Sequence, residues 1–275
     1  MTATTERRPR SQRWVRALPG ALSVVGPARV VERNTWAYRR MWLVFASGLA
    51  EPVLYLLAIG VGVGALVGEV EGPAGAVPYE EFVAPGLLAA AAMNGAVLDT
   101  TFNFFVRFKY IGTYNAMLAT PLRPSDIAAG EVTWSLLRGS FYAAAFLVAM
   151  LALGLVASPW AALAVPAAVL IGFGFAGAGL GASTWMRSWV DFDLVMLVVL
   201  PLFLFSGIFF PLSEYPEGLR LVVQLTPLYQ GVALERALVL GGVGWAQLGQ
   251  AAYLLVMGVA GLRVAGVRLG RLLGP

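Results

Sequence analysis

Histidine and cysteine are both absent from the 275 residues, and Lys109 is the only lysine. A chain without cysteine forms no disulfide and offers no thiolate, and the absence of histidine removes a Ser–His pair and the usual zinc ligands. Charged residues make up 12% of the chain, about half of what a soluble domain carries. We therefore expect no catalytic residue and no metal site, and the chain is not expected to be an enzyme.

Nucleotide-binding motifs are missing as well. No G-x-x-x-x-G-K-[ST] segment occurs, so the chain has no P-loop. The segment 172–177 (GFGFAG) matches G-x-G-x-x-G by letter, but it lies inside an apolar run with no strand before it. Its glycines instead predict a face of small residues for close helix packing in lipid. We expect no cofactor in this chain, and no nucleic-acid partner, because basic residues beside a membrane span bind anionic lipid.

Hydrophobic residues form 59% of the chain and gather in runs of roughly 20, the length of a membrane-spanning helix. We predict an all-α polytopic membrane protein with six transmembrane helices. The expected spans are 42–66, 82–105, 131–156, 160–184, 192–211 and 245–267. The first forty residues lack the apolar segment of a cleavable signal peptide, so the first span is expected to direct insertion.

Basic residues fall mostly on one side of these spans. Sixteen of the nineteen lie before the first span, in the loops after spans two and four, or near the C-terminal end. The first outer loop, 67–81, holds four glutamates and no basic residue. The positive-inside rule then places both termini and the 106–126 loop in the cytoplasm, with 67–81 and 207–243 outside. This predicts a multi-pass protein of the cytoplasmic membrane.

The N-terminal region divides into two parts. Residues 1–26 form an Arg-rich arm that we expect to be flexible or loosely held on anionic lipid. Residues 27–40 mix apolar and basic side chains, as in a helix lying along the inner membrane face. The alternative is a basic flank that merely obeys the positive-inside rule. The side chains expected at that interface are Arg33, Trp36, Arg39 and Arg40.

Residues 107–131 form a basic, polar segment between spans two and three. Within it an apolar, aromatic stripe recurs at helical spacing and predicts a short amphipathic helix. The stripe consists of Tyr110, Tyr114, Met117 and Leu118. Two hypotheses follow: the stripe packs on the ends of its own membrane helices, or it is a docking surface for another protein. We favour the docking surface.

Of the charged residues in the predicted spans, three lie well inside the span ends, where an unpaired charge costs about 2.5–3.5 kcal/mol or more. At about 1.5 Å per residue, Glu51, Asp99 and Arg138 reach comparable depths in the inner half of the bilayer. We predict that Arg138 pairs with at least one of the two carboxylates and fixes the packing of spans one to three. The alternative is that Arg138 extends alone to the headgroups while Glu51 is protonated beside Pro52.

The last outer segment, 207–243, is too polar and too often interrupted by proline to span, yet too apolar for a solvated loop. Short helices dipping into the outer leaflet would bury its apolar side chains and satisfy its backbone. The alternative is an extracellular hairpin packed on the spans. The residues expected to define these helices are Phe209, Phe210, Pro211 and Pro227.

An ordered set of short motifs resembles the type-2 ABC exporter permeases, nearest the nodulation lipo-oligosaccharide and daunorubicin-type branch. The motifs are EPVLYLLAIG at 51–60, YEEFVAPG at 79–86, YNAMLATP at 114–121, Gly130-Glu131 and SGIFFP at 206–211. None is catalytic, and only their ordered set is specific.

This resemblance implies that residues 27–275 form one permease domain with a connecting helix before span one. It also implies a coupling helix near 107–120, so that Tyr110, Tyr114, Met117, Leu118 and Glu131 would serve ATPase coupling. It implies two permease copies, or two related permeases, with two separate P-loop ATPase subunits that hold ATP and magnesium. The implied activity is export of a drug, lipid or lipid-linked saccharide across a bacterial inner membrane.

Two other functional classes fit the same composition. A passive channel or structural membrane protein would need no ATPase and would tolerate changes in the Tyr114 stripe. A membrane-embedded enzyme would have only carboxylate chemistry around Glu51 and Asp99 to use, since histidine and cysteine are absent.

Overall fold

The computed structural model describes residues 25–39, 50, 52–73 and 75–273, and it is almost entirely helical. One antiparallel hairpin, β1 (Glu69–Gly72) and β2 (Gly75–Pro78), pairs Glu69 with Pro78. The α-helices are α1 (Val25–Tyr38), α3 (Gly62–Val67), α4 (Tyr79–Leu98), α5 (Thr113–Leu118), α6 (Pro124–Ala152), α7 (Ala164–Ser183), α8 (Asp191–Leu204), α9 (Glu217–Leu225), α10 (Pro227–Leu240) and α11 (Ala246–Leu273). The predicted helical fold is therefore confirmed apart from this hairpin.

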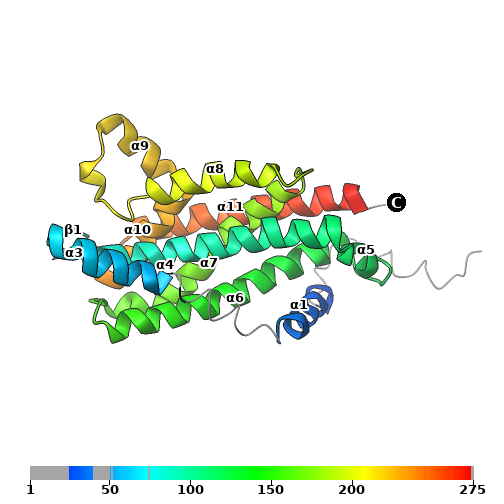
Figure 1. The fold of residues 1–275 in the computed structure, drawn as a ribbon, viewed down its shortest axis with the longest axis horizontal. Coiled ribbons are helices and arrows are strands. Elements are labelled where there is room, and N and C mark those ends of the chain that lie inside the picture. Colours follow the sequence, from blue (N-terminus) through cyan, green and yellow to red (C-terminus); the bar gives the residue numbers. More distant parts are fainter. Residues whose placement is uncertain (1–24, 40–49, 51, 74, 274–275) are drawn as a thin grey trace, which may run out of the picture.

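Four helical segments of the described chain are long and apolar enough to cross a membrane. They are Tyr79–Tyr110, Pro124–Ala152, Pro159–Ser183 and Trp245–Leu272, and they run side by side along the long axis (Figure 1). The fifth predicted span corresponds to α8, whose 14 residues extend only about 21 Å against a hydrocarbon core of about 30 Å. The described part of the first predicted span is the shorter helix Pro52–Val67. A polytopic membrane protein is supported, and the count of six stays a prediction.

Some helix boundaries differ from the predicted ones, and the local sequence explains why. Helix α6 begins at Pro124 rather than 131, because the Asp126 carboxylate accepts from the Arg123 backbone N–H (3.1 Å) and Pro occupies the first turn. Helix α8 ends at Leu204 rather than 211, since Pro201 lies inside its last turn and Gly207 adopts φ +72. The segment Tyr79–Tyr110 continues past 105 through two π-helical stretches, Asp99–Asn103 and Val106–Tyr110.

The core forms where α7 packs against α4, α6 and α11. The predicted small-residue face lies on the α7–α11 side: a Cβ added at Gly177 would meet the Gly258 backbone, and one added at Gly261 would meet Gly177. Backbones this close bury little side chain but gain many van der Waals contacts, the usual way helices associate in lipid.

The end of the bundle that carries β1 and α9 lies opposite α5 (Figure 1). Helix α10 is buried along most of its length, and its Thr226 cap accepts from the Tyr229 backbone N–H (3.4 Å) with Pro227 in the first turn. Helix α9 exposes Leu221, Val222 and Leu225, while the loop before it holds Phe209 half-buried and Phe210 exposed. The segment forms a 3-10 turn at Leu212–Glu214, then α9 and α10, and the insertion of short helices into a leaflet stays a prediction.

Candidate functional site

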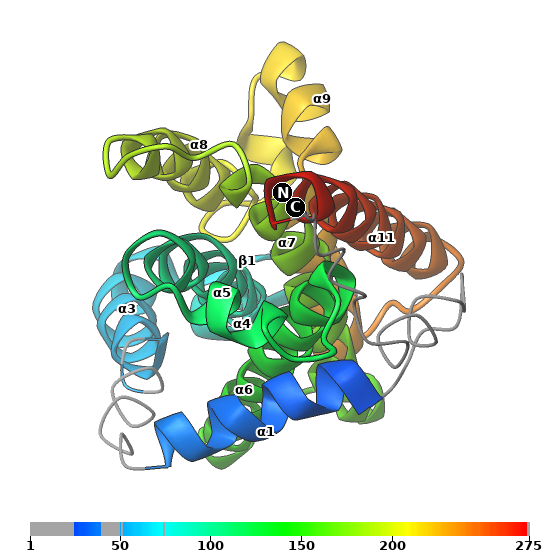
Figure 2. The same ribbon diagram turned by 90° about the vertical axis from the view of Figure 1, so that its right-hand side faces the viewer.

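Helix α1 lies across the α5 end of the bundle, against α6 (Figure 2). Its buried residues, Gly26, Val30 and Asn34, recur every four positions and so form one face. Gly130 on α6 permits the approach, because a Cβ there would stand 2.5 Å from Cβ of Val30. The predicted interfacial helix is thus an amphipathic helix held to α6 by one narrow face.

The outer face of α1 holds two of the four side chains expected at the membrane surface. Trp36 is 66% exposed, and the Arg39 guanidinium lies over its ring at 5.6 Å from the centroid. Arg33 instead turns toward α5, with Nη1 4.0 Å from Sδ of Met117. Arg40 lies outside the described residues. Contact of this face with lipid stays a prediction.

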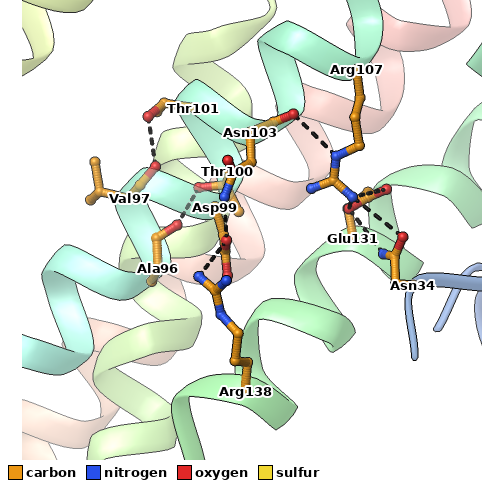
Figure 3. A network of polar contacts seen from close by, with 10 residues as sticks. All are labelled: Asn34, Ala96, Val97, Asp99, Thr100, Thr101, Asn103, Arg107, Glu131 and Arg138. Atoms are coloured by element: carbon orange, nitrogen blue, oxygen red, sulfur yellow. Dashed lines mark hydrogen bonds and ion pairs between the residues drawn. The ribbon is translucent and has the colours of Figure 1, made fainter. Parts of the chain in front are cut away.

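A polar network connects α1, the end of the second span and α6 (Figure 3). Arg138 Nη2 lies 2.5 Å from Asp99 Oδ1, and the same carboxylate oxygen accepts from Asn103 Nδ2 at 2.7 Å. The predicted pairing of Arg138 with one of two carboxylates is therefore present. Glu51, the other carboxylate, lies outside the described residues.

The network continues through a second ion pair that the sequence analysis did not predict. Arg107 Nε donates to the Asn103 backbone carbonyl at 3.1 Å, and Arg107 Nη1 lies 2.8 Å from Glu131 Oε2. Asn34 of α1 closes this end: its Nδ2 donates to Glu131 (3.3 Å) and its Oδ1 accepts from Arg107 (3.3 Å). Glu131, Asn34 and Arg107 are all buried, so α1 is held by a desolvated, mutually satisfied set of charges.

The short helix α5 follows Gly112, whose φ of +67 starts a new helix and shortens the one expected over 107–120. Tyr114 is 1% exposed, stacked on Phe104 with centroids 4.9 Å apart, and Met117 is 8% exposed. Leu118 is half-buried against the same core. Burial and the Glu131 carboxylate raise the pKa of Tyr114 well above its usual range, so its hydroxyl stays neutral.

This placement corrects the hypothesis that the Tyr114 stripe is a docking surface. Tyr114 and Met117 pack on their own chain, the alternative left open by the sequence, and Glu131 is buried in the polar network. Tyr110, the remaining member, is 58% exposed, but it stacks on Trp189. A helical stripe identifies an apolar face without saying what covers it, and here the core covers it. The exposed face of α5 is the opposite one, with Asn115 and Ala116.

An open groove of about 540 Å³ separates α5 from α1. Arg29, Val30 and Arg33 form one wall, and Ile111, Ala116 and Thr120 stand on the other. Ile111 is 65% exposed. The groove therefore combines positive charge with apolar surface at the end of the bundle that also holds the polar network.

At the opposite end of the bundle, the sequence did not predict two further buried ionisable residues on α10. Arg236 of α10 donates to the backbone carbonyls of Phe82 (3.2 Å) and Gly207 (2.8 Å), and its guanidinium lies 3.7 Å from the Phe82 ring centroid. Its neighbour Glu235 is fully buried, and neither carboxylate oxygen has a hydrogen-bond partner among the described residues. Arg236 thus ties α4 and the loop after α8 to α10, whereas we have no physical account of Glu235.

One missed signal was readable in the sequence. Asp99, Asn103 and Arg107 recur every four residues and so share one face of a helix. The link from Asn34 to Glu131 crosses 97 positions and has no local signature. Among the described residues, no group of three acidic side chains could hold a metal ion.

These features define the chain as a polytopic helical membrane protein with an amphipathic helix bound to one end of its bundle and a short helix beside it. The ABC-2 type transporter family model matches residues 28–240, and the chain belongs to this family. Members are membrane permeases that associate with an ABC ATPase.

Relatives support the same assignment. Nodulation protein J of Rhizobium leguminosarum bv. trifolii is 34% identical over 232 residues, which cover 82% of this chain and 85% of that protein. Nodulation protein J of Rhizobium meliloti (strain 1021) is 30% identical, covering 77% and 80%. The inner membrane transport permease YadH of Escherichia coli (strain K12) is 27% identical, covering 72% and 78%.

Proposed function

We propose that this chain is the transmembrane subunit of an ATP-driven exporter that moves an amphipathic or hydrophobic cargo outward across the cytoplasmic membrane. ATP and magnesium are held by two copies of a separate P-loop ATPase, in keeping with the absence of a P-loop here. In this proposal the chain has six membrane spans, and the positive-inside rule puts both termini and α5 in the cytoplasm. The cargo is a drug, a lipid or a lipid-linked saccharide.

The observation that carries this proposal is the groove between α1 and α5. Its rim exposes Ile111 and Ala116, while the buried side of α5 rests on Phe104 at the end of the second span. A protein bound in the groove would therefore push on α5 and, through the Tyr114 stack and the Arg107–Glu131 pair, on the spans. Rigid elements of this kind convert a local push into a change between two arrangements.

A second permease copy has a surface available on α8. No residue of α8 is buried, and its exposed side chains include Leu194, Leu197, Val198 and Leu200. A helix apolar all round is covered by lipid or by another protein. We infer that two copies pair and that cargo passes between them.

The test is a charge placed in the groove. Burial of an apolar side chain at an interface contributes about 1.5–3 kcal/mol, so Ile111→Asp with Ala116→Asp should weaken ATPase binding at least about tenfold. The proposed partner ATPase is co-expressed, and its co-purification and ATP hydrolysis are measured. Ser125→Asp adds one negative charge nearby but outside the groove lining, and it should change neither. Full co-purification by the double variant would refute the docking site.

A further inference from the structure

Helix α8 lies at the edge of the bundle (Figures 1 and 2). None of its residues is buried, although Val195 and Val199 in its middle pack partly against the core. At its C-terminal end, Phe203 meets Tyr55 (6.3 Å between centroids) and Phe209 (5.3 Å). Aromatic contacts thus fix the C-terminal end of α8 to its neighbours.

The contact at its other end is a cluster of five aromatic rings, here called the aromatic cluster. Phe102, Phe105 and Tyr110 come from the end of the second span, and Trp189 and Phe192 from the start of α8. Tyr110 stacks on Trp189 with centroids 5.1 Å apart. Phe192 makes edge contacts with Phe105 (5.2 Å) and Phe102 (5.3 Å). Such pairs contribute about 0.5–1.5 kcal/mol each beyond their buried area, so the cluster is a firm joint.

The turn that carries Trp189 is fixed by its own hydrogen bonds. The Asp191 carboxylate accepts from the backbone N–H groups of Arg187 (2.6 Å) and Ser188 (3.0 Å). This ties the residues just before Trp189 to the first residue of α8. The ring of Trp189 is thus held rigidly relative to the helix.

The other half of the joint belongs to the segment that holds the polar network. Asp99 and Asn103 alternate along this segment with Phe102 and Phe105, so that one side contacts α6 and the other contacts α8. Both π-helical stretches, Asp99–Asn103 and Val106–Tyr110, lie here, and the segment leads directly to Gly112 and α5. π-Helical turns are rare and occur frequently at functional sites.

We infer that the aromatic cluster transmits displacement of α5 to α8, with Trp189 and Phe192 as the positioning residues. A push on α5 moves the π-helical end of the second span, and the stacked rings carry α8 with it. This inference rests on the proposed function, because ATP-driven displacement of α5 is its input. It adds a route from the groove to the helix proposed to face the second copy.

The experiment follows α8 directly and needs no knowledge of the cargo. The chain has no native cysteine, so Val148→Cys on α6 and Leu197→Cys on α8, both exposed, take spin labels without interference. The labelled permease, diluted with unlabelled copies, is reconstituted with its ATPase in vesicles of phosphatidylethanolamine and phosphatidylglycerol. We expect ATP to shift the distance distribution in the parent, and Trp189→Ala with Phe192→Ala to abolish that shift while ATPase co-purification stays within twofold.

Matched variants identify the cause. Trp185→Ala removes a comparably exposed tryptophan from the same loop, outside the cluster, and should keep the shift. Trp189→Phe keeps an aromatic ring and should restore it. A full shift in the double alanine variant would overturn the inference. Loss of the shift together with loss of ATPase co-purification would overturn it as well.

A second measurement separates this inference from the proposed function. If the parent binds no ATPase, the proposed function fails, but the joint can still be tested in the permease alone. We expect the melting-temperature losses of Tyr110→Ala and Trp189→Ala to be non-additive, because the two rings stack. Additive losses would show that the rings do not join the two segments and would overturn the inference by themselves.

Discussion

The ion pair between Arg138 and Asp99 gives a prediction whose size follows from its surroundings. The two side chains are 11% and 4% exposed, and the joined atoms lie 2.5 Å apart. Removing one partner of a buried pair leaves an uncompensated charge and costs about 3–5 kcal/mol. At about 2–4 °C per kcal/mol for chains of 150–250 residues, Arg138→Leu should lower the melting temperature of detergent-solubilised protein by on the order of 10 °C.

The second variant in the cycle tests the pairing itself. Asp99→Asn removes the charge that Arg138→Leu leaves behind, so the double variant should recover part of the loss. Arg29→Leu is the control: it breaks an exposed pair with Glu32 of 2.9 Å, and exposed pairs contribute about 0–1 kcal/mol. Simple addition of the two single effects, or a loss no larger than that of Arg29→Leu, would refute the reasoning.

Three further changes test other parts of the structure. Glu131→Gln leaves Arg107 without its counter-charge and should cost about 3–5 kcal/mol of stability. Hydrogen exchange should then accelerate more in α1 than in α11, and equal acceleration in both helices would contradict the role of this pair. Glu235→Met removes a buried carboxylate that has no hydrogen-bond partner among the described residues, which costs about 1–3 kcal/mol. The melting temperature should therefore rise, and a fall would contradict this reading of Glu235. Gly130→Ala should cost about 1–3 kcal/mol and loosen α1, which faster proteolysis of α1 would show. Gly139→Ala has space for its Cβ and should leave the cleavage rate unchanged. Similar cleavage of both variants would contradict the close approach of α1 to α6.

Hydrophobic runs were enough to predict the helical membrane fold, because lipid forces every spanning backbone to satisfy its own hydrogen bonds. They did not predict where α8 ends. The sequence stays apolar to Phe210, but Pro201 and the positive φ of Gly207 end the helix at Leu204. The pairing of Arg138 was predictable because a charge in lipid needs a partner.

The direction of the Tyr114 stripe could not be predicted in the same way. Periodicity shows that a face is apolar, and only the tertiary structure shows that Phe104 covers it. The Asn34 link was equally hidden, since it joins an amphipathic helix to α6 across a long stretch of chain. Both misses lie where separate elements meet, and local pattern carries no information about such contacts.

The central claim is that this chain couples to a separate ATPase, and ATP hydrolysis measured with and without it tests that claim most directly. The proposed partner ATPase is placed in lipid vesicles alone, with the parent permease, and with the Ile111→Asp, Ala116→Asp variant. The account predicts stable association and a higher hydrolysis rate with the parent permease, and neither with the variant. A parent permease that purifies free of the ATPase and leaves its hydrolysis rate unchanged would contradict the account.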